Sequence, residues 1–280
     1  MKTAQKIALE YYRKKLKLIA AVSITRAAEQ AFKLFCTPQR KAKKNISPVI
    51  KKAERLSIKV NDYMVYGYRW NHPSAQKLLI AHGFESSAQN FEGFVTPLIN
   101  KGYEIIAFDA PAHGDSEGKQ IVLPLYIDML RAVSNTFGPF QAYIAHSFGG
   151  LALMHVLESM PQNENVKAVL IAPATEITSV IDRFFRLIQL NIKVRTVFDE
   201  LSAKVTGMTF QQASGGSIIK NIKANILWFH DTEDDVTPFK DAEKIKNMHL
   251  PNVEFVVSKG LGHRRIYRDQ HTVNKVLHFL

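Results

Sequence analysis

The chain of 280 residues is 46% hydrophobic, 10% aromatic and 22% charged, with 14 Gly and 11 Pro, which excludes collagen, low-complexity disorder and a disulfide scaffold and is compatible with one large α/β domain. Cys36 is the only cysteine, so neither an internal disulfide nor a thiolate metal cluster can form. The net charge of +12 is concentrated at one end, because residues 1–59 hold 16 Lys and Arg against three Asp and Glu, whereas residues 60–280 hold 21 against 22.

Residues 1–55 are predicted to form a basic helical extension. From Lys2 to about Phe35, apolar residues recur at three- and four-residue steps, which is the period of an amphipathic helix. No apolar run there reaches the roughly 18 residues that span a bilayer, and no cleavage site of a signal peptide follows. A basic connector is expected at residues 39–44, and Ser47-Pro48 predicts a new helix start. The apolar positions of the first helix are Ala4, Ile7, Ala8, Tyr11, Leu18 and Val22.

Residues 56–280 predict an α/β fold, with a mostly parallel eight-stranded sheet and helices on both faces. Short continuous apolar runs alternate there with segments of helical length, as expected where both faces of a parallel sheet are buried. The interval of about 174–221 is too long for one connection and contains the amphipathic stretch Ile181–Val194, so it predicts a short helical cap. The expected strands are a hairpin at 56–60 and 63–68, then 77–81, 104–108, 141–145, 167–172, 224–229 and 253–257, with helices such as 123–137 and 148–158 between them.

The stretch from Tyr143 to Gly150 is the most informative, because an apolar strand ends at Ser147 and a helix follows at once. Such a sharp turn leaves no room for large side chains two positions on either side of the serine, and Ala145 and Gly149 meet that requirement. The serine would stand beside a helix N-terminus, whose amide groups and positive potential suit an oxyanion. Taken alone, the pattern also fits an ordinary helix N-cap.

This stretch resembles the nucleophile elbow of the α/β-hydrolase superfamily, Gly-x-Ser-x-Gly, with Ala145 in place of the first glycine. A second element of the resemblance is His82-Gly83-Phe84, which ends an earlier strand. In that superfamily the residue after His-Gly supplies one amide of the oxyanion hole, so the resemblance assigns this role to the backbone amides of Phe84 and Phe148.

A serine nucleophile needs a general base, and the base needs a carboxylate that orients it. In α/β hydrolases these follow in the chain order serine, acid, histidine. The segment 230–238 resembles the acid loop of the superfamily, and alignment on Val236 and Pro238 selects Asp234. The segment Gly260-Leu261-Gly262-His263 resembles the loop that carries the base, which selects His263. The alternatives for the acid are Asp231, Asp235 and Glu176.

The resemblance implies a serine hydrolase that cleaves carboxylic esters through an acyl-enzyme and needs no cofactor or metal. Ser147 would be the nucleophile, His263 the proton shuttle and Asp234 the group that orients it. Thioester or carbon–carbon bond hydrolysis on the same residues stays open, as does a catalytically silent binding module. The loop 109–118 resembles that of monoglyceride-lipase-type members, which favours acyl chains, and we expect His113 within it to support the geometry of the site.

Phe184, Phe185 and Ile188 on the expected cap have two interpretations: they form an apolar pocket for an acyl chain, or they only bury the cap against the body.

The N-terminal helix also has two interpretations. A basic amphipathic helix can lie on an anionic membrane surface, or its apolar face packs on the hydrolase body while Lys and Arg face water. We expect a cytoplasmic protein, or one peripheral to the inner face of the membrane, with a small ester as substrate and no nucleic acid as partner.

Overall fold

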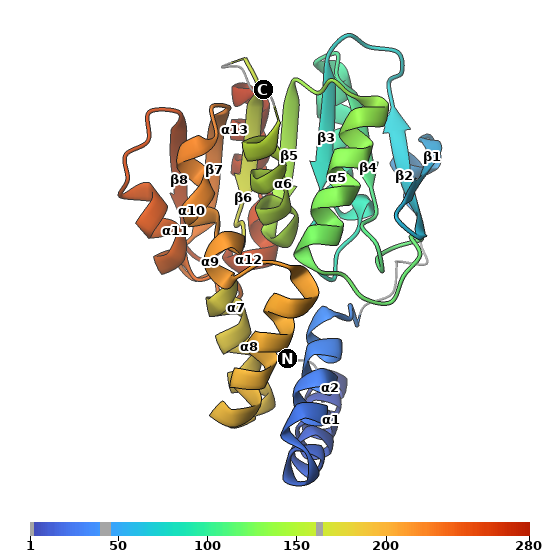
Figure 1. Cartoon of the computed structure of the whole chain (residues 1–280). Coiled ribbons are helices and arrows are strands. Elements are labelled where there is room, and N and C mark those ends of the chain that lie inside the picture. Colours follow the sequence, from blue (N-terminus) through green and yellow to red (C-terminus); the bar gives the residue numbers. More distant parts are fainter. Residues whose placement is uncertain (1–2, 40–45, 161–164) are drawn as a thin grey trace.

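The computed structural model describes residues 3–39, 46–160 and 165–280. Within these ranges, eight strands form one sheet in the order β1-β2-β4-β3-β5-β6-β7-β8 (Figure 1). The pairs β1–β2 and β2–β4 are antiparallel and the other five pairs are parallel, which confirms the predicted sheet. The strands are β1 Glu54–Val60, β2 Tyr63–Trp70, β3 Lys77–Ala81, β4 Glu104–Phe108, β5 Ala142–His146, β6 Lys167–Ile171, β7 Asn225–Asp231 and β8 Val253–Ser258.

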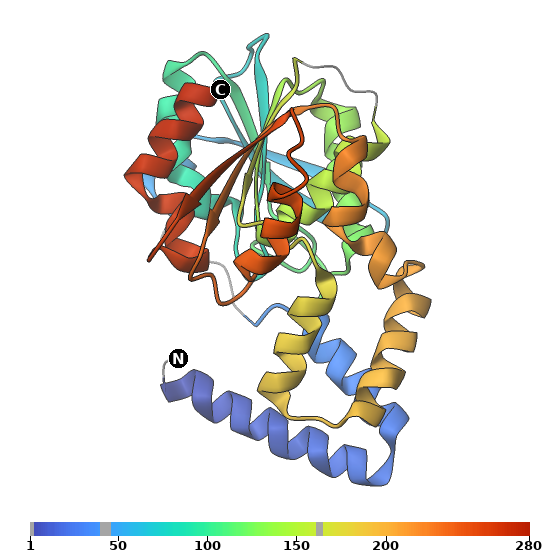
Figure 2. The ribbon, with the colours of Figure 1, turned by 90° about the vertical axis from the view of Figure 1, so that its left-hand side faces the viewer.

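Helices cover both faces of this sheet (Figures 1 and 2). Side chains of α5, α6 and α11 pack on one face, and those of α4 and α13 pack on the other. All five residues of β4 and of β5 are buried, which explains why these strands are continuous apolar runs rather than alternating ones. The longer helices are α1 Thr3–Val22, α2 Ile24–Cys36, α4 Glu92–Asn100, α5 Leu123–Phe137, α6 Ser147–Ser159, α7 Ile177–Ile188, α8 Ile192–Thr206, α11 Phe239–Lys246 and α13 Gln270–Phe279.

Short helical turns complete the chain. The helix start predicted at Ser47-Pro48 is present, but this helix is only one turn long. Residues 40–45 of the predicted basic connector lie outside the described residues. The turns are α3 Pro48–Lys51, η1 Ala88–Phe91, α9 Phe210–Ala213, α10 Gly215–Ile218, η2 Ile219–Asn221, α12 Gly262–Arg265 and η3 Ile266–Arg268.

Two predicted helical stretches are each broken in the structure. The N-terminal stretch divides at Ser23, whose extended backbone and side chain cap α2 by accepting from the amide of Arg26. The stretch predicted at 181–194 divides between α7 and α8, because Gln189 adopts a left-handed conformation (φ 55°) that ends α7. Asn191 then caps α8 through its side chain. Apolar periodicity continues across both breaks, which is why it did not reveal them.

A third core lies beyond the sheet, where α1, α2, α7 and α8 gather on one side (Figures 1 and 2). Phe32 of α2 contacts the ring of Phe198 on α8 edge to face, and Phe35 meets Phe184 and Phe198 in the same way. The cap therefore packs mainly against the N-terminal helix pair. In the described part of the chain, no helix combines the length and the apolar character that crossing a bilayer requires.

Candidate active site

The turn from β5 into α6 holds Ser147 in a conformation that bulky neighbours would prevent. Ser147 has φ 54°, in the left-handed region that most side chains avoid. A Cβ on Gly149 would lie 2.4 Å from the carbonyl oxygen of His82, and one on Gly83 would lie 2.9 Å from Cβ of Ser147. The two glycines therefore let β3 and its following loop approach the serine closely. The small-residue pattern predicted this for Gly149 but did not include Gly83.

The side chains of Ser147, His263 and Asp234 lie in hydrogen-bonding series, although the first two are 116 positions apart in the chain. His263 follows β8, and its Nδ1 lies 2.7 Å from Oδ2 of Asp234. A carboxylate only accepts, so Nδ1 carries the proton and donates it. Nε2 is then free to accept from the hydroxyl of Ser147 at 3.0 Å. All three residues are buried.

Asp234 is held by the loop that follows β7. Its Oδ1 accepts from the backbone amides of Val236 and Thr237, each at 2.8 Å. Burial raises the pKa of Asp234, but the hydrogen bond from His263, together with those from these amides, outweighs burial and holds the pKa below its ordinary value. The carboxylate therefore stays ionised beside the imidazole.

The three alternative acids have other surroundings. Oδ2 of Asp231 accepts from the Ser258 hydroxyl at 2.7 Å and from the Leu261 amide at 3.0 Å, so it fastens the loop that carries His263. The side chain of Asp235 is mostly exposed, and its Oδ2 lies 3.6 Å from Nη2 of Arg183. Glu176 precedes the first turn of α7. Of the four carboxylates, Asp234 is the one in contact with His263.

Phe84 and Phe148, the two residues assigned to the oxyanion hole, lie next to each other at the serine. Their ring centroids are 6.4 Å apart. Phe148 is the second residue of α6, where backbone amides have no acceptor within the helix. Phe84 follows Gly83, which lies against Ser147.

Two buried neutral histidines support the loop of Phe84. His82 Nδ1 donates to the carbonyl of Gly83 at 2.8 Å, and its Nε2 accepts from the Ala110 amide at 2.9 Å. His113 Nε2 accepts from the amide of Glu85 at 3.1 Å. Burial lowers the pKa of His82 to about 4 and, together with the neighbouring His82, that of His113 to about 3. The expectation that His113 supports the site geometry agrees with these contacts.

Thr237 lies at the centre of the site, although the sequence patterns predicted no role for it. The Thr237 hydroxyl lies 2.9 Å from Oδ2 of Asp234 and 3.1 Å from Nδ1 of His263. The ring of His230 in turn donates from Nε2 to the Thr237 carbonyl at 2.8 Å. The position of Thr237 between Val236 and Pro238, the two residues used to align the acid loop, was the available signal.

Phe184, Phe185 and Ile188 lie in the third core, not in a separate pocket of their own. Phe185 and Ile188 are buried among side chains of α1, α2 and α8, and Phe184 packs at the edge of the same cluster. Phe185 and Ile188 therefore bury the cap, as one of the two interpretations expected. The surface that they pack on is mainly that of the N-terminal helices, not the body of the hydrolase. The acyl-pocket hypothesis has no support from these contacts.

Within residues 3–39, 46–160 and 165–280, no group of three or more His, Cys, Asp or Glu side chains is arranged so that it could hold a metal ion.

The family follows from a comparison with known proteins. Residues 72–218, just over half of the chain, match the family model of the serine aminopeptidase S33 family. The chain belongs to this family of α/β hydrolases. An uncharacterized hydrolase of Bacillus subtilis, YugF, is 34% identical over 95 residues, which are 32% of this chain and 34% of that protein. The match to this curated relative therefore spans about a third of the relative's length.

Solved structures share the fold of this S33 hydrolase at low sequence identity. An esterase of Pyrococcus furiosus is 19% identical with a TM-score of 0.66, and the match covers 88% of this chain and 97% of that one. A putative lipase of Acinetobacter baumannii is 16% identical with a TM-score of 0.60, covering 86% and 97%. These likenesses establish a common fold.

Proposed function

We propose that this S33 hydrolase cleaves carboxylic esters through an acyl-enzyme intermediate on Ser147. The single observation that carries the proposal is the continuous contact from the Ser147 hydroxyl to Nε2 of His263 and from Nδ1 to Asp234, at 3.0 and 2.7 Å. A serine hydroxyl is a weak nucleophile at its free pKa, and an adjacent imidazole with a carboxylate behind it activates it.

In the proposed reaction, Nε2 of His263 takes the proton of Ser147 as Oγ attacks the ester carbonyl. The backbone amides of Phe84 and Phe148 stabilise the oxyanion that forms. His263 then gives its proton to the departing alcohol, which leaves Ser147 acylated. A water molecule, deprotonated by the same ring, attacks the acyl carbonyl, and Ser147 recovers its proton as the carboxylic acid leaves.

Esters are the first choice of substrate class because an alcohol leaves a tetrahedral intermediate more readily than an amine does. The esterase of Pyrococcus furiosus and the putative lipase of Acinetobacter baumannii share the fold, which is compatible with this choice. The name of the family makes an aminoacyl amide a second substrate to be assayed. Among the similar folds is also a thioesterase domain from the curacin biosynthetic pathway, so a thioester is the third.

The decisive experiment is the Ser147→Ala variant with a fluorophosphonate probe and p-nitrophenyl butyrate. Wild type should be labelled and should hydrolyse the ester, whereas Ser147→Ala should do neither and should keep its melting temperature. Ser202→Ala, at a buried serine of α8, is the matched control and should behave as wild type. Labelling that persists in Ser147→Ala would refute the assignment. A wild-type protein that is not labelled and hydrolyses no ester, thioester or aminoacyl anilide would be a silent binding module.

A further inference from the structure

A stripe of large apolar side chains on α1 is exposed. Ile7, Tyr11, Leu18 and Val22, which we call the α1 stripe, are 67, 60, 72 and 85% exposed. Their spacing of four, seven and four residues places them within about 60° of one another around the helix axis. These residues belong to the apolar face predicted from the sequence. The interpretation in which that face packs on the hydrolase body is therefore wrong for these four residues.

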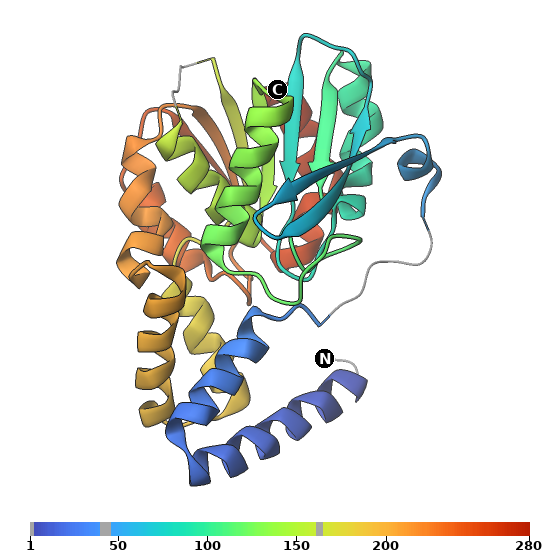
Figure 3. The ribbon, with the colours of Figure 1, turned by 45° about the vertical axis from the view of Figure 1, so that its right-hand side comes forward.

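The opposite side of α1 is the side attached to the protein. Leu16 is only 2% exposed and lies in the third core. Nε of Arg13 donates to the carbonyl of Leu187 at the end of α7 at 2.6 Å, and Lys17 donates to the side chain of Gln189 at 3.2 Å. Because these contacts fix the rotation of α1 about its axis, the α1 stripe points away from the cap. Figure 3 shows α1 and α2 diverging from the turn that joins them.

Cationic side chains accompany the α1 stripe. Lys14 and Lys15 are exposed and follow Tyr11 by three and four residues, the spacing of neighbours on one helix side. α1 carries five Lys and Arg and one acidic residue, Glu10, which pairs with Arg13. The face is thus apolar along its centre and positively charged along its flanks.

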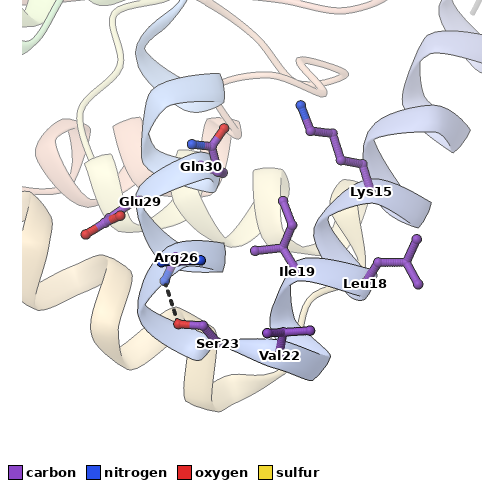
Figure 4. Close-up of a pocket in the computed structure, with 8 residues that line it drawn as sticks. All are labelled: Lys15, Leu18, Ile19, Val22, Ser23, Arg26, Glu29 and Gln30. Atoms are coloured by element: carbon purple, nitrogen blue, oxygen red, sulfur yellow. Dashed lines mark hydrogen bonds between the residues drawn. The ribbon is translucent and has the colours of Figure 1, made fainter.

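A groove of about 580 Å³ between α1 and α2 continues this surface (Figure 4). Lys15 and Ile19 point into it from α1, and Arg26 lines it from α2. Leu18 and Val22 of the α1 stripe form its outer edge. The groove therefore has an apolar wall on α1, which Lys15 accompanies, and a polar wall on α2, where Arg26 lies beside Glu29 and Gln30.

We propose that the α1 stripe docks on the surface of an anionic lipid bilayer, with α1 lying in the plane of the interface. The apolar side chains would enter the boundary between headgroups and acyl chains, and Lys14, Lys15 and Arg26 would meet anionic headgroups. The stripe is about 22 Å long, from 15 residues at 1.5 Å each, so several side chains contact one lipid surface together. This inference is independent of the proposed ester hydrolysis.

Charge selects the bilayer over a second copy of the chain as the occupant. Two α1 stripes packed face to face would bring Lys14 and Lys15 of both copies together, and like charges repel. An anionic lipid surface attracts the same residues, and residues 1–59 carry a net charge of +13, from 16 basic and three acidic side chains.

The test is co-sedimentation of the full chain with vesicles of phosphatidylcholine alone or mixed with phosphatidylglycerol. We expect binding to the mixed vesicles that weakens with added salt. Leu18→Glu/Val22→Glu should lower the partition coefficient by roughly tenfold or more, since each Leu or Val loses its transfer from water and the glutamates are repelled. Lys14→Glu/Lys15→Glu should lower it for the mixed vesicles only.

Val205→Glu on α8, at another exposed apolar residue, is the matched control and should bind as wild type does. Ser147→Ala should also bind fully, so that loss of hydrolysis and loss of docking are distinguishable. Equal binding to both vesicle types, or unchanged binding of Leu18→Glu/Val22→Glu, would overturn the proposal. The proposal would also be overturned if the chain bound no vesicle and instead formed a dimer that Leu18→Glu/Val22→Glu dissociates. That result would identify a second copy of the chain as the occupant.

Discussion

The hydroxyl of Thr237 donates to Oδ2 of Asp234 at 2.9 Å, the same carboxylate oxygen to which His263 donates. Its own oxygen lies 3.1 Å from Nδ1 of His263, so the threonine braces both partners of the contact. Thr237 touches no reacting atom and is a positioning residue. Its effect should be on the alignment of the imidazole rather than on substrate binding.

Removing this hydroxyl should therefore lower turnover selectively. In Thr237→Val we expect kcat to fall about tenfold or more, by analogy with other residues that orient a functional histidine, while KM for a small ester changes little. Thr237→Ser keeps the hydroxyl and should recover most of the rate. A Thr237→Ser variant as slow as Thr237→Val would mean that the methyl group, through packing, is what matters.

Replacing the carboxylate of Asp234 should lower kcat more than removing the Thr237 hydroxyl does. Asp234→Asn cannot accept from Nδ1–H of His263 in the same way and favours the wrong tautomer, so we expect a loss of about 10⁴ in kcat. Asp231→Asn is the informative comparison, because Asp231 fastens the loop of His263. It should lower the free energy of unfolding more than Asp234→Asn does and reduce kcat less. The opposite ranking in kcat would make Asp231 the catalytic acid.

Close packing behind the serine gives a prediction about stability. In Gly149→Ala the new methyl carbon would lie 2.4 Å from the carbonyl oxygen of His82 and 2.8 Å from that of Ala81, and neither backbone atom can move aside easily. We expect a loss of at least about 2 kcal/mol in the free energy of unfolding, measured in urea. Gly93→Ala in α4 meets no atom within 4 Å and should be neutral or stabilising by up to about 1 kcal/mol.

The buried histidines should make the fold sensitive to acid. Burial lowers the pKa of His82 from 6.5 to about 4, and burial with the adjacent His82 lowers that of His113 to about 3. Below about pH 6.5 the unfolded chain therefore binds protons that the folded protein does not, so stability is full above that pH and falls as pH drops toward 4. The slope should be up to about 1 kcal/mol per pH unit for each of the two histidines.

Melting temperatures between pH 7 and pH 4 would measure this slope. His113→Gln should flatten it, whereas His271→Gln, at an exposed histidine of α13, should leave it unchanged. A slope that is the same in all three proteins would assign the acid sensitivity to other groups.

The sheet and the grouping of the site residues were predictable because both depend on local patterns. Continuous apolar runs located six of the strands, and Asn61-Asp62 marked the hairpin of the first two, all within two residues at each end. Burial on both faces explains such runs in the central strands β4 and β5. Parallel strands end at one edge, so Ser147, Asp234 and His263, each placed after such a strand, were expected to meet there. Their hydrogen bonds agree with that expectation.

The partner of an apolar helix face was not predictable. Periodicity shows that a face exists, but not what covers it, and Leu18 and Phe185 illustrate the two outcomes. Leu18 belongs to a regular apolar face and is 72% exposed. Phe185, in contrast, fills a core whose buried residues run from Leu16 to Phe198, 182 positions apart in the chain. Contacts between segments so distant in sequence depend on tertiary packing alone.

The third core also determines where this chain can be shortened. Ala28, Ala31 and Phe32 of α2 are buried in the same core as Phe198 and Ile188 of the cap, and the ring of Phe32 contacts that of Phe198. Starting the polypeptide at residue 46 would leave those two side chains facing water and would remove the framework on which the cap rests. Recombinant versions should therefore retain α2, and a docking experiment based on deleting the first 45 residues would measure misfolding instead of lipid affinity.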